Sequence, residues 1–146
     1  MKEIDKILLK EGKDAKEVLE KLILEHPIED MIQFTDINIQ EKIKENTRNV
    51  VKYNDLYQKE LGILDVLTDK MESLFGKRYD YYRFDYEKEL TKIEIERYYL
   101  PNDVYIKKMK KLIRRQNIKV RFFKLCYQAF DKMGWSMKLF WETIKF

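Results

Sequence analysis

The chain has 146 residues, 38% of them charged and 45% apolar, with only 4 glycines and 2 prolines. This composition favours long, charge-laced helices over a turn-rich β fold, and the length suits one domain, which a helical chain often completes by self-association. The net charge of +4 is uneven: residues 107–146 carry 12 Lys or Arg and 2 Asp or Glu, a net of +10, whereas 1–50 and 51–106 each carry 9 and 12, a net of −3.

The cellular compartment is predicted from cysteine content and hydropathy. The single cysteine, Cys126, excludes an intramolecular disulfide and lies in an apolar stretch, which indicates a buried thiol in a reducing compartment. The N-terminus lacks the apolar core of a signal peptide, and no stretch approaches the roughly 18 apolar residues of a membrane span. We therefore expect a cytoplasmic protein without a membrane partner.

The first third has a less regular pattern than the rest. A short helix is predicted from Ala15 to Glu25, and His26-Pro27 ends it because a residue before proline is pushed out of the helical region. We interpret residues 1–33 as a partly helical N-terminal extension that is mobile or binds a partner.

A long helix is predicted from about Asp36 to about Tyr79. Apolar residues recur every seven positions there, with a companion set between them, as in a coiled-coil seam. The repeat comprises Ile43, Val50, Tyr57, Leu64 and Met71, with Tyr53, Leu67 and Leu74 at the companion offset. The segment 77–86, dense in aromatic and basic residues, is expected to end this helix in a turn.

The last part of the chain predicts two more helices after a shorter helical or extended piece over 87–99. Asn102 or Asp103 suits the N-cap of a helix from Val104 to about Met133. Its seam comprises Met109, Ile113, Gln116, Val120, Phe123, Tyr127 and Phe130. Gly134 is expected to break this helix, and residues 135–146 to form a short aromatic C-terminal helix.

No catalytic motif stands out along the chain. It has no glycine-rich phosphate loop, no paired metal-ligand spacing and no nucleophile set beside a base, and His26 and Cys126 carry no other part of a Cys–His site. Glu94 and Glu96 could serve a metal-dependent nuclease, but a spacing of two places them on different helix faces. We expect neither a cofactor nor a metal, and we predict that the protein is not an enzyme.

Two basic clusters bear on phosphate binding, and each has a structural alternative. The first cluster lies over residues 77–83 and includes the ring of Tyr79. It suits single-stranded DNA, because cations neutralise phosphates while aromatic rings stack on unpaired bases. Alternatively, its tyrosines pack the end of a helix. The second is either a polyanion surface or a solvated face paired with acidic residues of another protomer. The first comprises Lys77, Arg78, Tyr81, Tyr82 and Arg83; the second includes Lys107, Lys108, Lys111, Arg114, Arg115 and Arg121, with Lys110, Lys119 and Lys124 between them.

The aromatic C-terminal segment needs cover, because several large rings are costly to expose. Docking onto a neighbouring subunit is favoured over a membrane surface, since the segment has few cations and no lipidation signal. The predicted contacts between subunits are Trp135, Met137, Phe140, Trp141 and Ile144.

The chain resembles the UvsY-type recombination mediators of large tailed bacteriophages. The resemblance covers roughly residues 34–146 and is carried by the long heptad helix leading into Lys77-Arg78-Tyr79-Asp80-Tyr81-Tyr82, and by the closing Gly134-Trp135-Ser136-Met137-Lys138 with its aromatic-ended Ile144-Lys145-Phe146. In the family a basic cluster precedes a similar aromatic pair. The position of the family's other basic residue is Gly76 here, and the segment 83–86 is shorter than the family's glycine-rich loop.

The resemblance implies an all-α, ring-forming homo-oligomer in the host cell cytoplasm. Such a mediator binds single-stranded DNA and loads a RecA-like phage recombinase onto strands covered by single-strand-binding protein. Carried over by residue, the DNA contact falls on Arg78 and Lys77, and the C-terminal assembly helix falls on 135–146. The alternative from the residues alone is a coiled-coil structural or adaptor protein without DNA binding.

Overall fold

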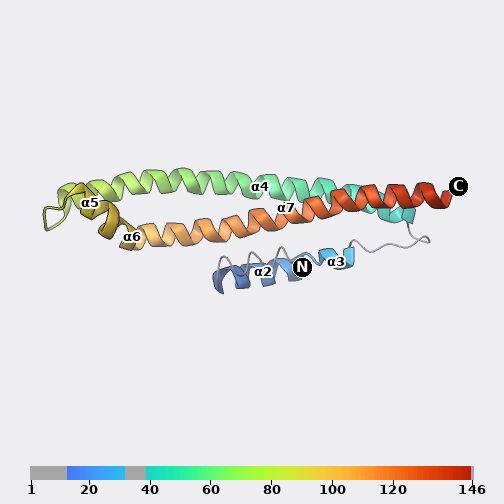
Figure 1. The fold of residues 1–146 in the computed structure, drawn as a ribbon, viewed down its shortest axis with the longest axis horizontal. Helices are drawn as coiled ribbons and strands as arrows, with labels where there is room; N and C mark the ends of the chain where they lie inside the picture. The colour runs from blue at the N-terminus through green and yellow to red at the C-terminus, as the bar shows by residue number, and fades with distance from the viewer. Residues whose placement is uncertain (1–12, 32–38, 146) are drawn as a thin grey trace. The chain divides into compact units, whose positions relative to one another are not determined.

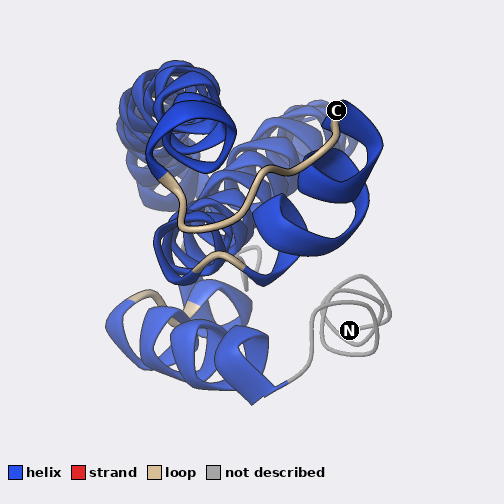
Figure 2. Cartoon of the chain, turned by 90° about the vertical axis from the view of Figure 1, so that its left-hand side faces the viewer, coloured by secondary structure: helices blue, strands red, loops and turns tan. Residues whose placement is uncertain are grey.

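A computed structural model describes the backbone of residues 13–31 and 39–145, with side chains except at 13–15, 29, 30, 140 and 143–145. Over these residues the chain forms helices and loops, with no strand, which confirms the all-α class (Figure 1, Figure 2). The elements are α2 (Lys13–Glu25), α3 (Ile28–Met31), α4 (Ile39–Asp80), the π-helical turn η1 (Tyr81–Asp85), α5 (Lys92–Glu94), the π-helical turn η2 (Ile95–Tyr99), α6 (Leu100–Asn102) and α7 (Val104–Lys145).

Contacts divide the chain into two units. The terminal unit comprises residues 1–61 and 118–146, and the central unit comprises residues 62–117. Both long helices contribute to each unit, because α4 passes from one to the other at Leu61 and α7 does so at Ile118.

Both predicted seams face inward. On α4, Tyr53 and Met71 are buried and the other members of the heptad set are half-buried. On α7, the members from Gln116 onward are buried apart from the half-buried Tyr127. The 3.6-residue helical period places these positions on one face, and packing of that face supplies most of the stability of helices in proteins.

The core of the terminal unit joins α2, α4 and α7. Tyr53 stacks on Phe130 with ring centroids 5.2 Å apart, and His26 contacts Tyr53 through a hydrogen bond of 2.9 Å between Nδ1 and the hydroxyl. Leu19 and Leu22 of α2 belong to the same buried cluster. The helix predicted over 15–25 is confirmed, and two of its leucines pack in the chain's own core, while the role expected for residues 1–33 as a whole stays a prediction.

The predicted helix break at Gly134 is wrong, and residues 135–145 continue α7 without interruption. A Cβ built at Gly134 would lie 2.9 Å from Nδ2 of Asn46, which itself donates a 2.9 Å hydrogen bond to the carbonyl oxygen of Phe130. Phe130 lies one helical turn before Gly134. The glycine therefore provides the space through which a buried side chain of α4 reaches the backbone of α7.

The central unit forms around the end of α4. The predicted turn over 77–86 begins later than expected, because α4 runs to Asp80 and continues as η1 before the chain becomes extended at Tyr86. The piece expected over 87–99 is helical only from Lys92, where Thr91 forms a capping box with Glu94. The core of the central unit comprises Tyr82, Leu90, Ile95 and Leu100, with Phe75, Tyr79, Tyr86 and Tyr99 packed against it.

Among the described helices, none combines the length and the apolar character that crossing a bilayer requires.

Candidate nucleic-acid interface

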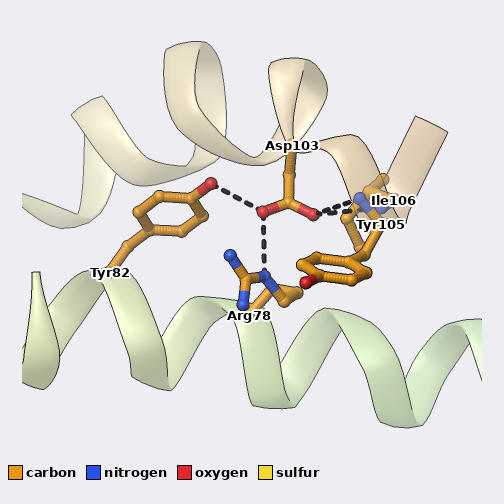
Figure 3. A network of polar contacts seen from close by, with 5 residues as sticks. All are labelled: Arg78, Tyr82, Asp103, Tyr105 and Ile106. Carbon is orange, nitrogen blue, oxygen red and sulfur yellow. Dashed lines mark hydrogen bonds and ion pairs between the residues drawn. The ribbon is translucent and has the colours of Figure 1, made fainter.

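The two basic clusters of the sequence meet within the central unit. Arg78, near the end of α4, contacts Asp103 and Tyr105 at the start of α7 (Figure 3), and Lys107 and Lys108 come two and three residues after Tyr105. Cations that are about thirty positions apart in the sequence therefore flank a single contact between two helices.

Asp103 is at the centre of this contact. Its Oδ1 accepts hydrogen bonds from the backbone N–H groups of Tyr105 at 2.9 Å and Ile106 at 3.0 Å, which confirms it as the N-cap of α7. Its Oδ2 accepts from the Tyr82 hydroxyl at 2.6 Å and from Nε of Arg78 at 2.8 Å (Figure 3). Burial alone would raise the pKa of the Asp103 carboxyl, but the donors of Tyr82, Ile106 and Arg78 lower that pKa below its ordinary value.

Aromatic rings surround the Arg78 guanidinium. Its Cζ lies 4.4 Å from the ring centroid of Tyr81, 4.8 Å from that of Tyr105 and 5.4 Å from that of Tyr82. Cation–π contacts of this kind hold a guanidinium in place while leaving its edge able to donate. Tyr105 is 57% exposed, so this ring also offers surface to solvent.

The first predicted cluster divides into an outer and an inner set. Lys77 and Arg83 are exposed, and Tyr81 is 37% exposed. Tyr82 is buried beside Tyr86 and Tyr99, with ring centroids 5.5 and 5.4 Å away, so its ring is unavailable for stacking on a base. The packing interpretation is therefore confirmed for Tyr82, while the interpretation as a surface for single-stranded DNA stays a prediction for the exposed members of the cluster.

The second predicted cluster lies along α7. Lys107, Lys108 and Lys111 are exposed, as are Lys110, Arg114 and Lys124, whereas Arg115, Lys119 and Arg121 are half-buried. No acidic residue occurs between Val104 and Phe130. Because the helix turns by about 100° per residue, the cations at 107, 111 and 114 share a face away from the buried Ile106.

Asp103 and Tyr105 are the site residues that the sequence argument did not find. The sequence predicts Asp103 as a helix cap, but an aspartate at a helix start does not reveal the partner of its second carboxylate oxygen. Tyr105 carries no signal beyond being an aromatic residue at a helix start. Only the approach of α4 to α7 connects either residue to Arg78.

The residues predicted for oligomer contacts differ in exposure. Trp135 is 66% exposed, with Nζ of Lys138 lying 5.5 Å from its ring centroid, whereas Met137 is 2% exposed inside its own chain. Trp141 is half-buried, and the side chains of Phe140 and Ile144 lie outside the described residues. Leu139 adds a second exposed apolar side chain close to Trp135 in sequence.

Two observations on the described residues concern metal binding and thiol chemistry. Across residues 13–31 and 39–145, no group of three His, Cys, Asp or Glu side chains could hold a metal ion. Cys126 is buried, and its burial raises the pKa of the thiol to about 12, so almost no reactive thiolate exists at neutral pH.

In comparisons with known proteins, no protein-family model, no curated protein and no solved structure matches the chain. The resemblance to the phage mediators therefore rests on the residues quoted for it.

Proposed function

We propose that this chain is a recombination mediator. It binds single-stranded DNA as a homo-oligomer and loads a RecA-like phage recombinase onto strands covered by single-strand-binding protein. The observation that supports DNA binding most directly is the meeting of the two basic clusters at Arg78 and Tyr105. The mediator role itself rests on the resemblance in sequence.

The chemistry of this surface suits single strands. Exposed cations on both sides of the Arg78–Tyr105 contact neutralise phosphates, and the exposed rings of Tyr81 and Tyr105 offer faces on which unpaired bases stack. Neither mode of contact reads a base sequence, so binding tolerates any sequence and weakens steeply with salt. A mediator that must later release its strand requires this behaviour.

Assembly multiplies a weak site. The exposed side chains of Trp135 and Leu139 on α7 provide apolar surface that a second copy would cover. Repeating the basic surface on each protomer lets one strand engage several sites, so that avidity adds to the affinity of each.

A fluorescence titration with oligo-dT tests the binding. Replacing Lys77, Lys107 and Lys108 together with Ala removes three exposed cations from the site. The matched control replaces Lys44, Lys59 and Lys70, three exposed lysines elsewhere on α4. The site variant should lose roughly 0.7 in the slope of log affinity against log salt for each lost contact, while the control variant keeps the slope of the unmodified chain.

The same experiment separates the mediator from the structural alternative. A coiled-coil adaptor would form an oligomer but would show no affinity for oligo-dT at moderate salt. Equal slopes for the two triple variants would refute the assignment of the surface. The loading step is measured by whether the chain shortens the lag before a phage recombinase hydrolyses ATP on strands covered with single-strand-binding protein.

A further inference from the structure

The two oxygens of Asp103 have separate tasks. Oδ1 caps α7 through two backbone N–H groups, while Oδ2 accepts from the Tyr82 hydroxyl and from Nε of Arg78 (Figure 3). The Asp103 side chain is 1% exposed, whereas that of Arg78 is 21% exposed. The carboxylate is therefore an internal anchor, and the guanidinium still reaches the surface.

The charge of Asp103 is shared among several partners. Four donors and the positive end of the α7 dipole compensate the carboxylate, so Arg78 is one contributor among these. The hydrogen bond to Asp103 uses Nε, so this carboxylate does not occupy the two terminal amino groups of the guanidinium, although Tyr82 also interacts with the Arg78 side chain. Arg78 keeps both charge and donors that an outside anion can use.

The anchor also fixes the direction of the guanidinium. With Nε tied to Oδ2 and the rings of Tyr81 and Tyr105 within 4.8 Å of Cζ, the side chain is restrained before any ligand arrives. A flexible arginine must lose this freedom upon binding, and an arginine already in place avoids that cost.

We propose that Asp103 is the positioning residue for Arg78: its buried carboxylate holds the guanidinium so that the terminal amino groups face a phosphate of the bound strand. This inference rests on the proposed binding of single-stranded DNA and adds to it the group that prepares the contact. Asp103 itself does not touch the strand.

The substitution Asp103→Asn isolates this role. Asparagine is as good an N-cap as aspartate, so its Oδ1 keeps the cap of α7. Its amide nitrogen replaces Oδ2 and can only donate, so it repels Nε–H of Arg78. We expect oligo-dT affinity to fall about fivefold, the order expected when the strand must immobilise one long side chain itself, with little change in salt slope.

Two control variants separate positioning from charge and from general loosening. Asp85→Asn removes the same charge from an exposed position of the central unit and should bind oligo-dT equally or slightly more tightly. Thr91→Ala removes the cap of α5, which joins Thr91 to Glu94, and should leave the affinity unchanged. In an Arg78→Ala background, Asp103→Asn should have no further effect, because the residue it positions is gone.

The outcomes are distinguishable from failure of the proposed function. If the unmodified chain does not bind oligo-dT, the proposed function itself is overturned. If it binds and Asp103→Asn binds as tightly or more tightly, this inference alone is overturned, and the same holds if its effect persists in the Arg78→Ala background. If Asp103→Asn does not fold, Arg78→Lys provides the test. The single ammonium group of lysine would pair with Asp103 and leave no second group for a phosphate, so an unchanged affinity for oligo-dT would refute the positioning role of Asp103.

Discussion

Gly134 and Asn46 form a pair whose coupling can be measured. A glycine inside a helix costs about 1 kcal/mol relative to alanine, so Gly134→Ala on its own would be expected to stabilise α7. Here the new Cβ would stand 2.9 Å from Nδ2 of Asn46, too close for both atoms. Asn46 is 6% exposed and its amide donates to the Phe130 carbonyl, so the amide moves only by losing that bond.

The expected magnitudes follow from these contacts. Displacing the amide costs about 2 kcal/mol, the net value of the hydrogen bond plus a buried donor left without a partner. Subtracting the propensity gain, Gly134→Ala should destabilise the chain by about 1 kcal/mol. In an Asn46→Ala background the Cβ meets no amide, so the same substitution should stabilise by about 1 kcal/mol, a coupling of about 2 kcal/mol.

Urea unfolding followed by circular dichroism measures all four chains of this cycle. Protein concentration must be the same throughout, because the proposed self-association would contribute to apparent stability. A reversal in the sign of the Gly134→Ala effect between the two backgrounds is the expected result. If Gly134→Ala stabilises both backgrounds equally, Gly134 has no packing role and the explanation for the unbroken α7 is wrong.

Three further predictions concern the terminal unit. Burial, and after it the charge of Lys52, lowers the pKa of His26 below 6.5, while the charge of Glu25 acts in the opposite direction. The neutral imidazole therefore contributes its full stability above pH 6.5, and this contribution is lost as the pH falls through the lowered pKa of the folded chain. The urea midpoint should therefore fall between about pH 7.5 and about pH 5 more for the unmodified chain than for His26→Gln, and an equal fall would contradict this. Cys126 should react with a thiol reagent only in urea, because burial raises its pKa to about 12; rapid reaction of the native chain would count against its burial. Phe130→Ala should cost about 3–5 kcal/mol in the free energy of unfolding, since Phe130 is 0% exposed, whereas Phe84→Ala, at a 76% exposed ring, should cost at most about 0.5 kcal/mol; similar costs would mean that the core is misidentified.

The long helices could be predicted because their signal is periodic. Tyr53 and Met71 on α4 and Val120 and Phe123 on α7 lie on the faces that the seven-residue and four-three spacings indicated. Each residue adds to the same pattern, so a single disagreement does not change the result. The cap at Asp103 was also predictable, since it depends on a residue and its own helix.

The contacts that differ from the sequence predictions for Gly134 and Arg78 join residues far apart in the sequence. From the sequence alone Gly134 is predicted to break the helix, but the Asn46 amide, 88 positions earlier, lies where a side chain at position 134 would begin. Likewise, the sequence predicts Arg78 as an exposed cation, whereas in the structure it contacts Asp103 and Tyr105. Propensity and motif describe a residue together with its neighbours along the chain, so neither can reveal such partners.

The division into a continuous and a discontinuous unit sets an order for folding. The central unit uses only residues 62–117, so its contacts close short loops, whereas the terminal unit must join Tyr53 to Phe130 across the whole of that segment. Loop closure costs more entropy as the connecting chain lengthens, and an already compact connection reduces that cost. We therefore expect the central unit to fold first, and the contact between Arg78 and Asp103, which joins α4 to α7 within that unit, to form before the core around Tyr53 and Phe130.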